Sequence, residues 1–202
     1  MKAIIFDFDG VIHDTFDFHL TRLKRFCSDL TDSDLREAHE GNIFCDKNKL
    51  MDIDLTGYGD YIFKDISQLE MSPMIRVVLE NLSRDHDLYI VTSGRERNIK
   101  GYLERNHASD LFKAVLGMET AKSKKDKFRK IMDTERLSTE DILFITDTLG
   151  DIIEAKALGL RVIAVEGGYH SKATLLEGEP ECILPDLSKL EECLAFPTVN
   201  TE

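Results

Sequence analysis

Short apolar runs alternate along the chain with segments of helical periodicity. The apolar runs show no polar alternation, which is typical of parallel strands covered on both faces. They comprise residues 3–6, 88–91, 114–116, 142–145 and 161–165, with a short sixth candidate at 182–184. Between them, apolar residues recur three and four positions apart, which predicts helices with one buried face.

Local signals mark the ends of several of these helices. Ser72 and Pro73 have the residue types favoured at an N-cap and at the first helical position. A helix expected over residues 151–158 would stop at Gly159. Strands and helices that alternate in this way predict right-handed crossovers and a parallel sheet with helices on both faces. The pattern therefore indicates a three-layer α/β/α fold.

Residues 15–71 interrupt the alternation. This stretch is polar and helix-biased, and it contains no strand of the parallel type. Thr31 and Asp34 have the spacing of a capping box, and Gly41 would end that helix. A structureless loop of this length is implausible inside a compact domain. We therefore expect a small helical cap at residues 15–71, inserted into a catalytic core formed by residues 1–14 and 72–202.

Composition and charge exclude several classes of protein. The chain has 202 residues, 42% of them hydrophobic, with 26 basic and 38 acidic residues and a formal charge of −12. This balance excludes wholesale disorder and disfavours nucleic-acid binding, but it permits one small phosphorylated ligand. No apolar run approaches the roughly 18 residues of a membrane span, and acidic residues interrupt the N-terminal one. We expect a cytoplasmic protein without a nucleic-acid or membrane partner, either a monomer or a homodimer.

Two aspartates, Asp7 and Asp9, follow the first predicted strand directly. Alternation along a strand would place both on the same side. Two carboxylates after a buried strand are costly unless something compensates their charge, and a divalent cation would do so. The alternative is a polar strand end with capping aspartates.

A second pair, Asp147 and Asp151, follows the strand at 142–145. A capping box from Thr148 to Asp151 would explain Asp151 and leave Asp147 unexplained. In open parallel sheets, ligands bind beyond the carboxyl ends of the strands, where both pairs would converge. Hard oxygen ligands at one site favour magnesium. We therefore predict Mg²⁺ as the cofactor, with Asp7, Asp9, Asp147 and Asp151 as its ligands.

Two further segments could bind an anion. Thr92, Ser93 and Gly94 follow the strand at 88–91 and offer hydroxyl and backbone N–H groups, although an ordinary N-cap would look the same. A run of lysines precedes the helix near residue 128. One of them could neutralise a phosphate, and the others would form a solvated face. The run consists of Lys122, Lys124, Lys125 and Lys127.

Taken in order, these segments resemble the motifs of the haloacid dehalogenase superfamily of hydrolases, especially its phosphoglycolate-phosphatase-like and β-phosphoglucomutase-like members. Residues 7–11 match the first motif, Thr92 the second, and Asp147 with Asp151 the fourth. The third motif begins with a lysine, and the spacing from Lys122 to the following phenylalanine fits it, although both of its prolines are missing. Lys122 is therefore assigned this role, with Lys124 and Lys125 as alternates. The resemblance implies a Rossmann-like core with a mobile cap.

The resemblance also implies roles. Asp7 would be the nucleophile that forms an aspartyl-phosphate, and Asp9 the general acid and then base. Magnesium would bind Asp7, the Asp9 carbonyl and Asp147, and Asp151 would act as a ligand, through water or by orienting its neighbours. An acid at Asp9 argues against dehalogenation, since a halide leaves without a proton. The transferring phosphoryl group would contact Thr92, Ser93, Gly94 and Lys122.

Two residues, His39 and Asn42, lie where related caps carry a specificity loop, so the resemblance makes them candidate substrate contacts. The favoured alternative for each is a surface position beside a helix end. The loop histidine His170 could reach the rim of the site or could simply be structural. The predicted function is that of a magnesium-dependent phosphatase acting on a small phosphorylated metabolite. The alternatives are a phosphomutase, which would share every core residue, and a silent binding protein with the same fold.

Overall fold

Six strands form one parallel sheet in the computed structural model, which describes residues 1–195. Each strand pairs in parallel with its neighbours in the order β3-β2-β1-β4-β5-β6. The order reverses beside β1, where β2 lies on one side and β4 on the other, and such a switch point is where open sheets bind ligands. All the predicted strands are confirmed, the short sixth included. They are β1 (Ala3–Phe6), β2 (Asp87–Val91), β3 (Ala114–Leu116), β4 (Ile142–Thr146), β5 (Arg161–Val165) and β6 (Cys182–Leu184).

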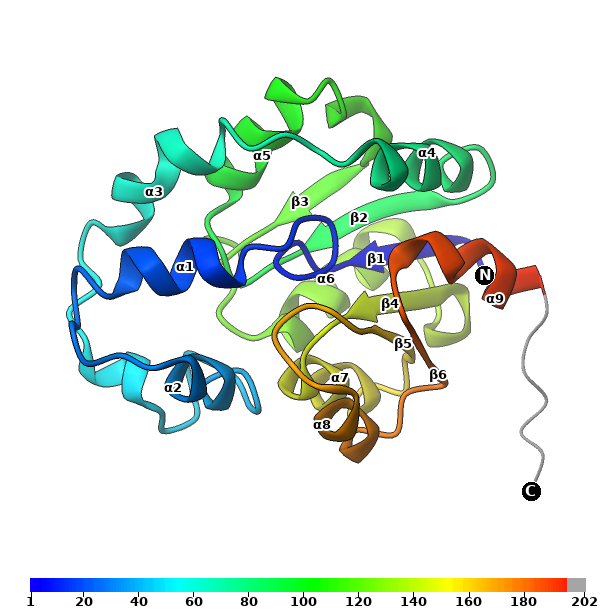
Figure 1. Ribbon diagram of the computed structural model, residues 1–202. Coiled ribbons are helices and arrows are strands. Elements are labelled where there is room, and N and C mark those ends of the chain that lie inside the picture. Colours follow the sequence, from blue (N-terminus) through cyan, green and yellow to red (C-terminus); the bar gives the residue numbers. More distant parts are fainter. Residues whose placement is uncertain (196–202) are drawn as a thin grey trace.

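Helices cover both faces of the sheet, as Figure 1 shows with α4 and α5 above it and α7 and α8 below. Alternate strand residues supply two separate cores: Ile4 and Phe6 pack with α4 and α5, and Ala3 and Ile5 with α6 and α7. The predicted three-layer α/β/α fold is therefore confirmed. The core helices are α4 (Pro73–Leu82), α5 (Glu96–Arg105), α6 (Lys124–Glu135), α7 (Leu149–Lys156), α8 (Lys172–Glu177) and α9 (Leu190–Ala195), with 3₁₀ turns η2 (Ser109–Leu111), η3 (Thr139–Asp141) and η4 (Leu187–Lys189).

The segment between β1 and α4 is helical, and Figure 1 shows it on the side to which the strands point. It comprises α1 (Phe16–Leu23), α2 (Asp32–Glu37), the 3₁₀ turn η1 (Lys49–Asp52) and α3 (Tyr58–Ile66). The Thr31–Asp34 capping box forms as expected, but α2 ends at Glu37 rather than at Gly41. The cap has a small core of its own, built from side chains such as Leu20 and Leu35.

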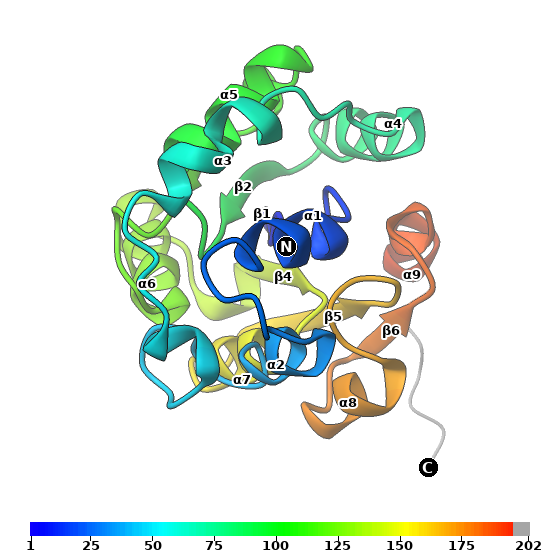
Figure 2. The same cartoon turned by 60° about the vertical axis from the view of Figure 1, so that its left-hand side comes forward.

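Contacts on opposite sides of the cap join it to the core. Asp60 of α3 pairs with Arg97 of α5 at 2.5 Å, and Figure 2 shows these two helices side by side. On the other side, Tyr169 from the loop after β5 completes the small core of the cap. The division at residues 14 and 72 stays a prediction. None of the helices in the described part of the chain is long and apolar enough to cross a membrane.

Candidate active site

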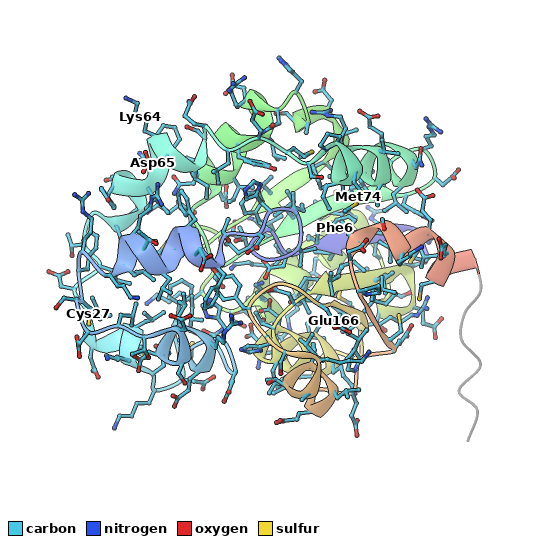
Figure 3. All side chains as sticks on the ribbon, viewed as in Figure 1. Phe6, Cys27, Lys64, Asp65, Met74 and Glu166 are labelled. Atoms are coloured by element: carbon cyan, nitrogen blue, oxygen red, sulfur yellow. The ribbon has the colours of Figure 1, made fainter. Side chains whose placement is uncertain are left out.

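The first pair of aspartates lies where β1 ends. Phe6, labelled in Figure 3, is the last residue of the strand, and the Asp7 amide extends the ladder by donating to the Ile145 carbonyl at 2.9 Å. The chain then turns at Gly10, whose φ is +75°. A Cβ on Gly10 would overlap the carboxylate of Asp147, so glycine allows the two strand ends to approach closely.

Lys124 lies between two carboxylates and is almost completely buried. Its Nζ is 2.7 Å from Asp7 Oδ2 and 2.6 Å from Asp151 Oδ2. Although burial favours the neutral amine, Asp151 and Asp7 raise the pKa of Lys124 above its usual value. Burial would also raise the pKa of Asp151, but the Lys124 charge lowers it to about 2. For Asp7, burial outweighs the lysine and raises the pKa.

The assignment of Lys122 to the site is therefore wrong, and its alternate Lys124 takes that position. Lys122 is exposed. Ser123 caps α6, and Lys124, the first residue of the helix, turns into the site while its amide donates to Glu154 at 3.0 Å. Lys127, one turn later, is also buried, and it donates to the Thr92 carbonyl at 2.7 Å. Burial lowers the pKa of Lys127 to about 8.

Asp147 is fully buried at the end of β4. Its Oδ2 accepts a hydrogen bond of 2.6 Å from the Tyr169 amide, and glycines 10 and 168 leave room for the carboxylate. Its Oδ1 has no hydrogen-bond partner among the described residues. Burial raises the pKa of Asp147 to about 8. One oxygen of this carboxylate is thus fixed and the other is available to a ligand.

The capping-box explanation of Asp151 is wrong. Helix α7 begins at Leu149, two residues earlier than expected, and the Thr148 side chain makes no capping hydrogen bond. Asp151 instead accepts from the Thr146 hydroxyl at 2.8 Å and from Lys124. The carboxylate therefore faces the site and orients the lysine.

Asp9 is held by two side chains from the start of the cap. Its Oδ1 accepts from the Thr15 hydroxyl at 2.5 Å and lies 3.1 Å from Nε2 of His19 on α1. Nδ1 of His19 lies 2.7 Å from the Tyr58 hydroxyl. Burial would raise the pKa of Asp9, but His19 and Thr15 together bring it below the usual value. His19 and Tyr58 could not be predicted from the sequence, because no motif distinguishes them from other polar residues of the cap.

The residues at these strand ends fit a magnesium ion. Asp7, Asp9, Asp147 and Asp151 supply four carboxylates, and Lys124 is the ammonium that pairs with two of them. Among residues 1–195, no three His, Cys, Asp or Glu side chains are arranged as a ready metal site. Magnesium needs only one or two carboxylates, because waters and substrate phosphates complete its coordination. The buried, unpartnered Oδ1 of Asp147 is the donor that such an ion would satisfy.

The segment after β2 forms a tight turn. Thr92 is buried, and its hydroxyl accepts from the Gly94 amide at 2.9 Å. Ser93 lines a small cavity of about 30 Å³ together with Asp7, Asp9 and Lys124. The structure therefore brings Ser93 to the aspartates, while the Thr92 hydroxyl supports the turn.

The two cap candidates also reach this cavity. The His39 ring lies 2.8 Å from the Leu35 carbonyl, the His39 carbonyl accepts from the Gly150 amide at 3.0 Å, and burial lowers the pKa of His39 to about 4. Asn42 donates to Glu154 of α7 at 3.1 Å. Both residues thus lie at the interface between the cap and α7 rather than on an open surface.

His170 has a structural position. It is buried, its Nδ1 accepts from the Leu149 amide at 2.9 Å, and its Nε2 lies 2.8 Å from the carbonyl of Arg36 on α2. The Arg36 guanidinium in turn bonds to the Tyr169 carbonyl and lies over the Phe16 ring. The loop after β5 therefore fastens the cap to the core.

Comparison with known proteins places this geometry in a family. The chain is 28% identical over 137 residues to a phosphoglycolate phosphatase of Photorhabdus laumondii, covering 66% of this chain and 58% of that protein. It is 32% identical over 117 residues to a 5′-nucleotidase of Pseudomonas aeruginosa, covering 56% and 52%. The chain thus spans little more than half the length of these curated relatives.

Solved structures share the fold over almost the whole chain. A predicted phosphatase from Clostridium acetobutylicum superposes with a TM-score of 0.79 at 21% identity, covering 96% of this chain and 99% of that one. A predicted phosphoglycolate phosphatase from Haemophilus somnus gives 0.77 at 19% identity, covering 96% and 98%. Residues 4–165 match the family described as haloacid dehalogenase-like hydrolase. The resemblance noted in the sequence is therefore confirmed, and the chain belongs to the haloacid dehalogenase-like hydrolases.

Proposed function

We propose that the protein is a magnesium-dependent phosphatase that hydrolyses a small phosphate monoester through an aspartyl-phosphate on Asp7. The observation that carries this proposal is the arrangement of Asp7 and Asp9 around one small cavity, with Lys124 bound to Asp7. The names of the two curated relatives, a phosphoglycolate phosphatase and a 5′-nucleotidase, support the same class of reaction.

In the first step, a carboxylate oxygen of Asp7 attacks phosphorus while the bond to the leaving oxygen breaks. Asp9 gives that oxygen a proton, and it later takes one from the water that hydrolyses the aspartyl-phosphate. Because His19 and Thr15 both bind Oδ1 of Asp9, Oδ2 is the oxygen that carries the proton. A phosphate dianion brought close to Asp9 raises its pKa, which favours protonation when substrate binds.

Lys124 and the segment at Thr92 would position the phosphoryl oxygens, which is mainly an electrostatic task. Asp151 would serve by holding Lys124 in place. Asp7 and Asp147, with the Asp9 carbonyl, would hold the magnesium ion. When bound, the ion would neutralise negative charge on the phosphoryl group.

The test is phosphate release from a panel of phosphate monoesters, with magnesium and with excess chelator. We expect release that requires magnesium and is lost in Asp7→Asn, with circular dichroism showing that the variant is folded. Trapping of label from ³²P-substrate on the wild-type protein, but not on Asp7→Asn, would identify the intermediate. Full activity in Asp7→Asn would refute the nucleophile, and transfer of label to a second substrate hydroxyl instead of water would indicate the phosphomutase alternative.

A further inference from the structure

A second and larger cavity, of about 220 Å³, opens beside Asp9 between the cap and the core. Cap side chains line one part of it, and α5 with the residues after β3 line the other. Its wall is mainly aliphatic and aromatic. Representative residues are Leu23, Leu35, Leu50, Ile62, Ile99 and Met118.

The two cavities differ in chemistry although they meet. The small cavity has Asp7, Lys124 and Asp151 in its wall and suits a phosphate group. None of these three residues lines the larger cavity. Asp9 and Ser93 line both. A phosphate monoester bound at Asp7 would therefore extend past Asp9 into an apolar space.

The apolar surface begins very close to the proposed proton donor. A Cβ placed on Gly94, in the wall of the larger cavity, would lie 3.9 Å from Asp9 Oδ2 and 3.9 Å from Cδ1 of Ile99. The proposed proton donor and the Ile99 side chain of the apolar wall thus both border Gly94.

One polar side chain of the wall binds the backbone of the cap. Asn98 is 2% exposed, and its Nδ2 donates to the Gly59 carbonyl at 3.1 Å. Its Oδ1 forms no hydrogen bond within residues 1–195. Because Oδ1 is itself buried from solvent, a molecule in the cavity does not reach it, and Asn98 adds no polar contact to the apolar wall. Arg95 also lines the cavity, and its Nη1 lies 3.5 Å from Oδ1 of Asp60 on α3.

We propose, resting on the phosphatase function above, that the preferred substrate is a phosphate ester of a mainly apolar, ring-bearing alcohol. The volume of the larger cavity, about 220 Å³, supports a ring in the substrate, because an apolar cavity of about 150 Å³ is enough to hold benzene. Sugar phosphates and phosphoglycolate fit less well, since most of the wall is apolar and offers their hydroxyl or carboxylate groups few partners.

The test compares kcat/KM with magnesium for 2-phenylethyl phosphate, glycerol 3-phosphate and phosphoglycolate. We expect the aromatic ester to be favoured by about 10-fold or more, the effect of burying one apolar group of this size. Equal or higher kcat/KM for the two polar esters would overturn this inference and leave the phosphatase function standing. Absence of phosphate release from every ester, in folded protein, would instead refute the phosphatase function.

A matched pair of variants tests whether the apolar part of the substrate binds in the larger cavity. Met118→Gln places a polar group of similar size in the cavity wall, whereas Met74→Gln changes an exposed methionine on α4. We expect Met118→Gln to lower kcat/KM for 2-phenylethyl phosphate about tenfold through a higher KM, with glycerol 3-phosphate unaffected, and Met74→Gln to change neither. Equal losses for both substrates in Met118→Gln would show a general structural defect and refute the assignment of the cavity.

Discussion

Replacing Lys124 with methionine tests the centre of the site, and Lys122→Met is its matched control. In the folded protein Lys124 holds the pKa of Asp151 at about 2, against an ordinary value of 3.8. At about 1.36 kcal/mol for each pKa unit, this difference stabilises the folded state by about 2 kcal/mol at neutral pH. Methionine also leaves Asp7 without its cation, so the total loss should approach the roughly 3–5 kcal/mol typical of a broken buried ion pair.

The loss of folding stability in Lys124→Met should depend on pH in a defined direction. The lowered pKa of Asp151 stabilises the wild type above about pH 4, and this contribution disappears as the pH falls toward 2. In Lys124→Met the pKa values of Asp7 and Asp151 are both raised by burial, so the folded state binds protons that the unfolded chain releases. The variant should therefore lose further stability as the pH rises from 4 to 8.

Urea denaturation of both variants at pH 5 and pH 8, in magnesium-free buffer, measures these changes. Phosphate release with magnesium should fall about 10²- to 10³-fold in Lys124→Met, as when one donor to a developing anion is removed. Lys122 is exposed, so Lys122→Met should match the wild type in both assays. Wild-type stability at pH 8 in Lys124→Met, or loss of activity confined to Lys122→Met, would refute the reasoning.

Three further changes probe the cap and the metal. In Gly150→Ala the new Cβ would overlap the Gly41 carbonyl. Although alanine is the better helix former, the variant should be about 1–3 kcal/mol less stable in urea denaturation. An unchanged urea midpoint would mean that the cap loop at Gly41 is not closely packed against α7. His39, with its pKa lowered to about 4, should make the wild type lose stability as the pH falls from about 6.5 toward 4, and thermal melts of His39→Gln should lack this part of the dependence. Magnesium at about 100 times its Kd should stabilise the protein by about 2.7 kcal/mol in a thermal melt, and Asp147→Asn should abolish the shift; an equal shift in that variant would exclude Asp147 as a ligand.

The fold could be predicted because a strand that is buried on both faces of the sheet is an uninterrupted apolar run in the sequence. Residues 142–145 are apolar without interruption, and all four are fully buried in β4. The start of α7 was placed two residues late, since Leu149 and Gly150 continue the strand-to-helix turn without any signal of a boundary. The segment at residues 15–71 was predicted to be helical, and one of its helix starts, the capping box of Thr31 and Asp34, is confirmed. The long loops around η1 explain why its other elements could not be predicted in detail.

The residues of the candidate site also differ in whether the sequence could predict them. Asp7 and Asp147 could be found because a carboxylate after an apolar run needs a compensating charge wherever the strand ends. The choice among the lysines depends instead on which residue begins α6, and that is decided by the hydroxyl of Ser123, which accepts from the Lys125 amide. The role of His19 could not be predicted from the sequence, because its contact with Asp9 depends on how α1 packs across the carboxyl ends of the strands. Contacts between the cap and the core thus complete the candidate site around Asp9, and they are the part that only the three-dimensional structure reveals.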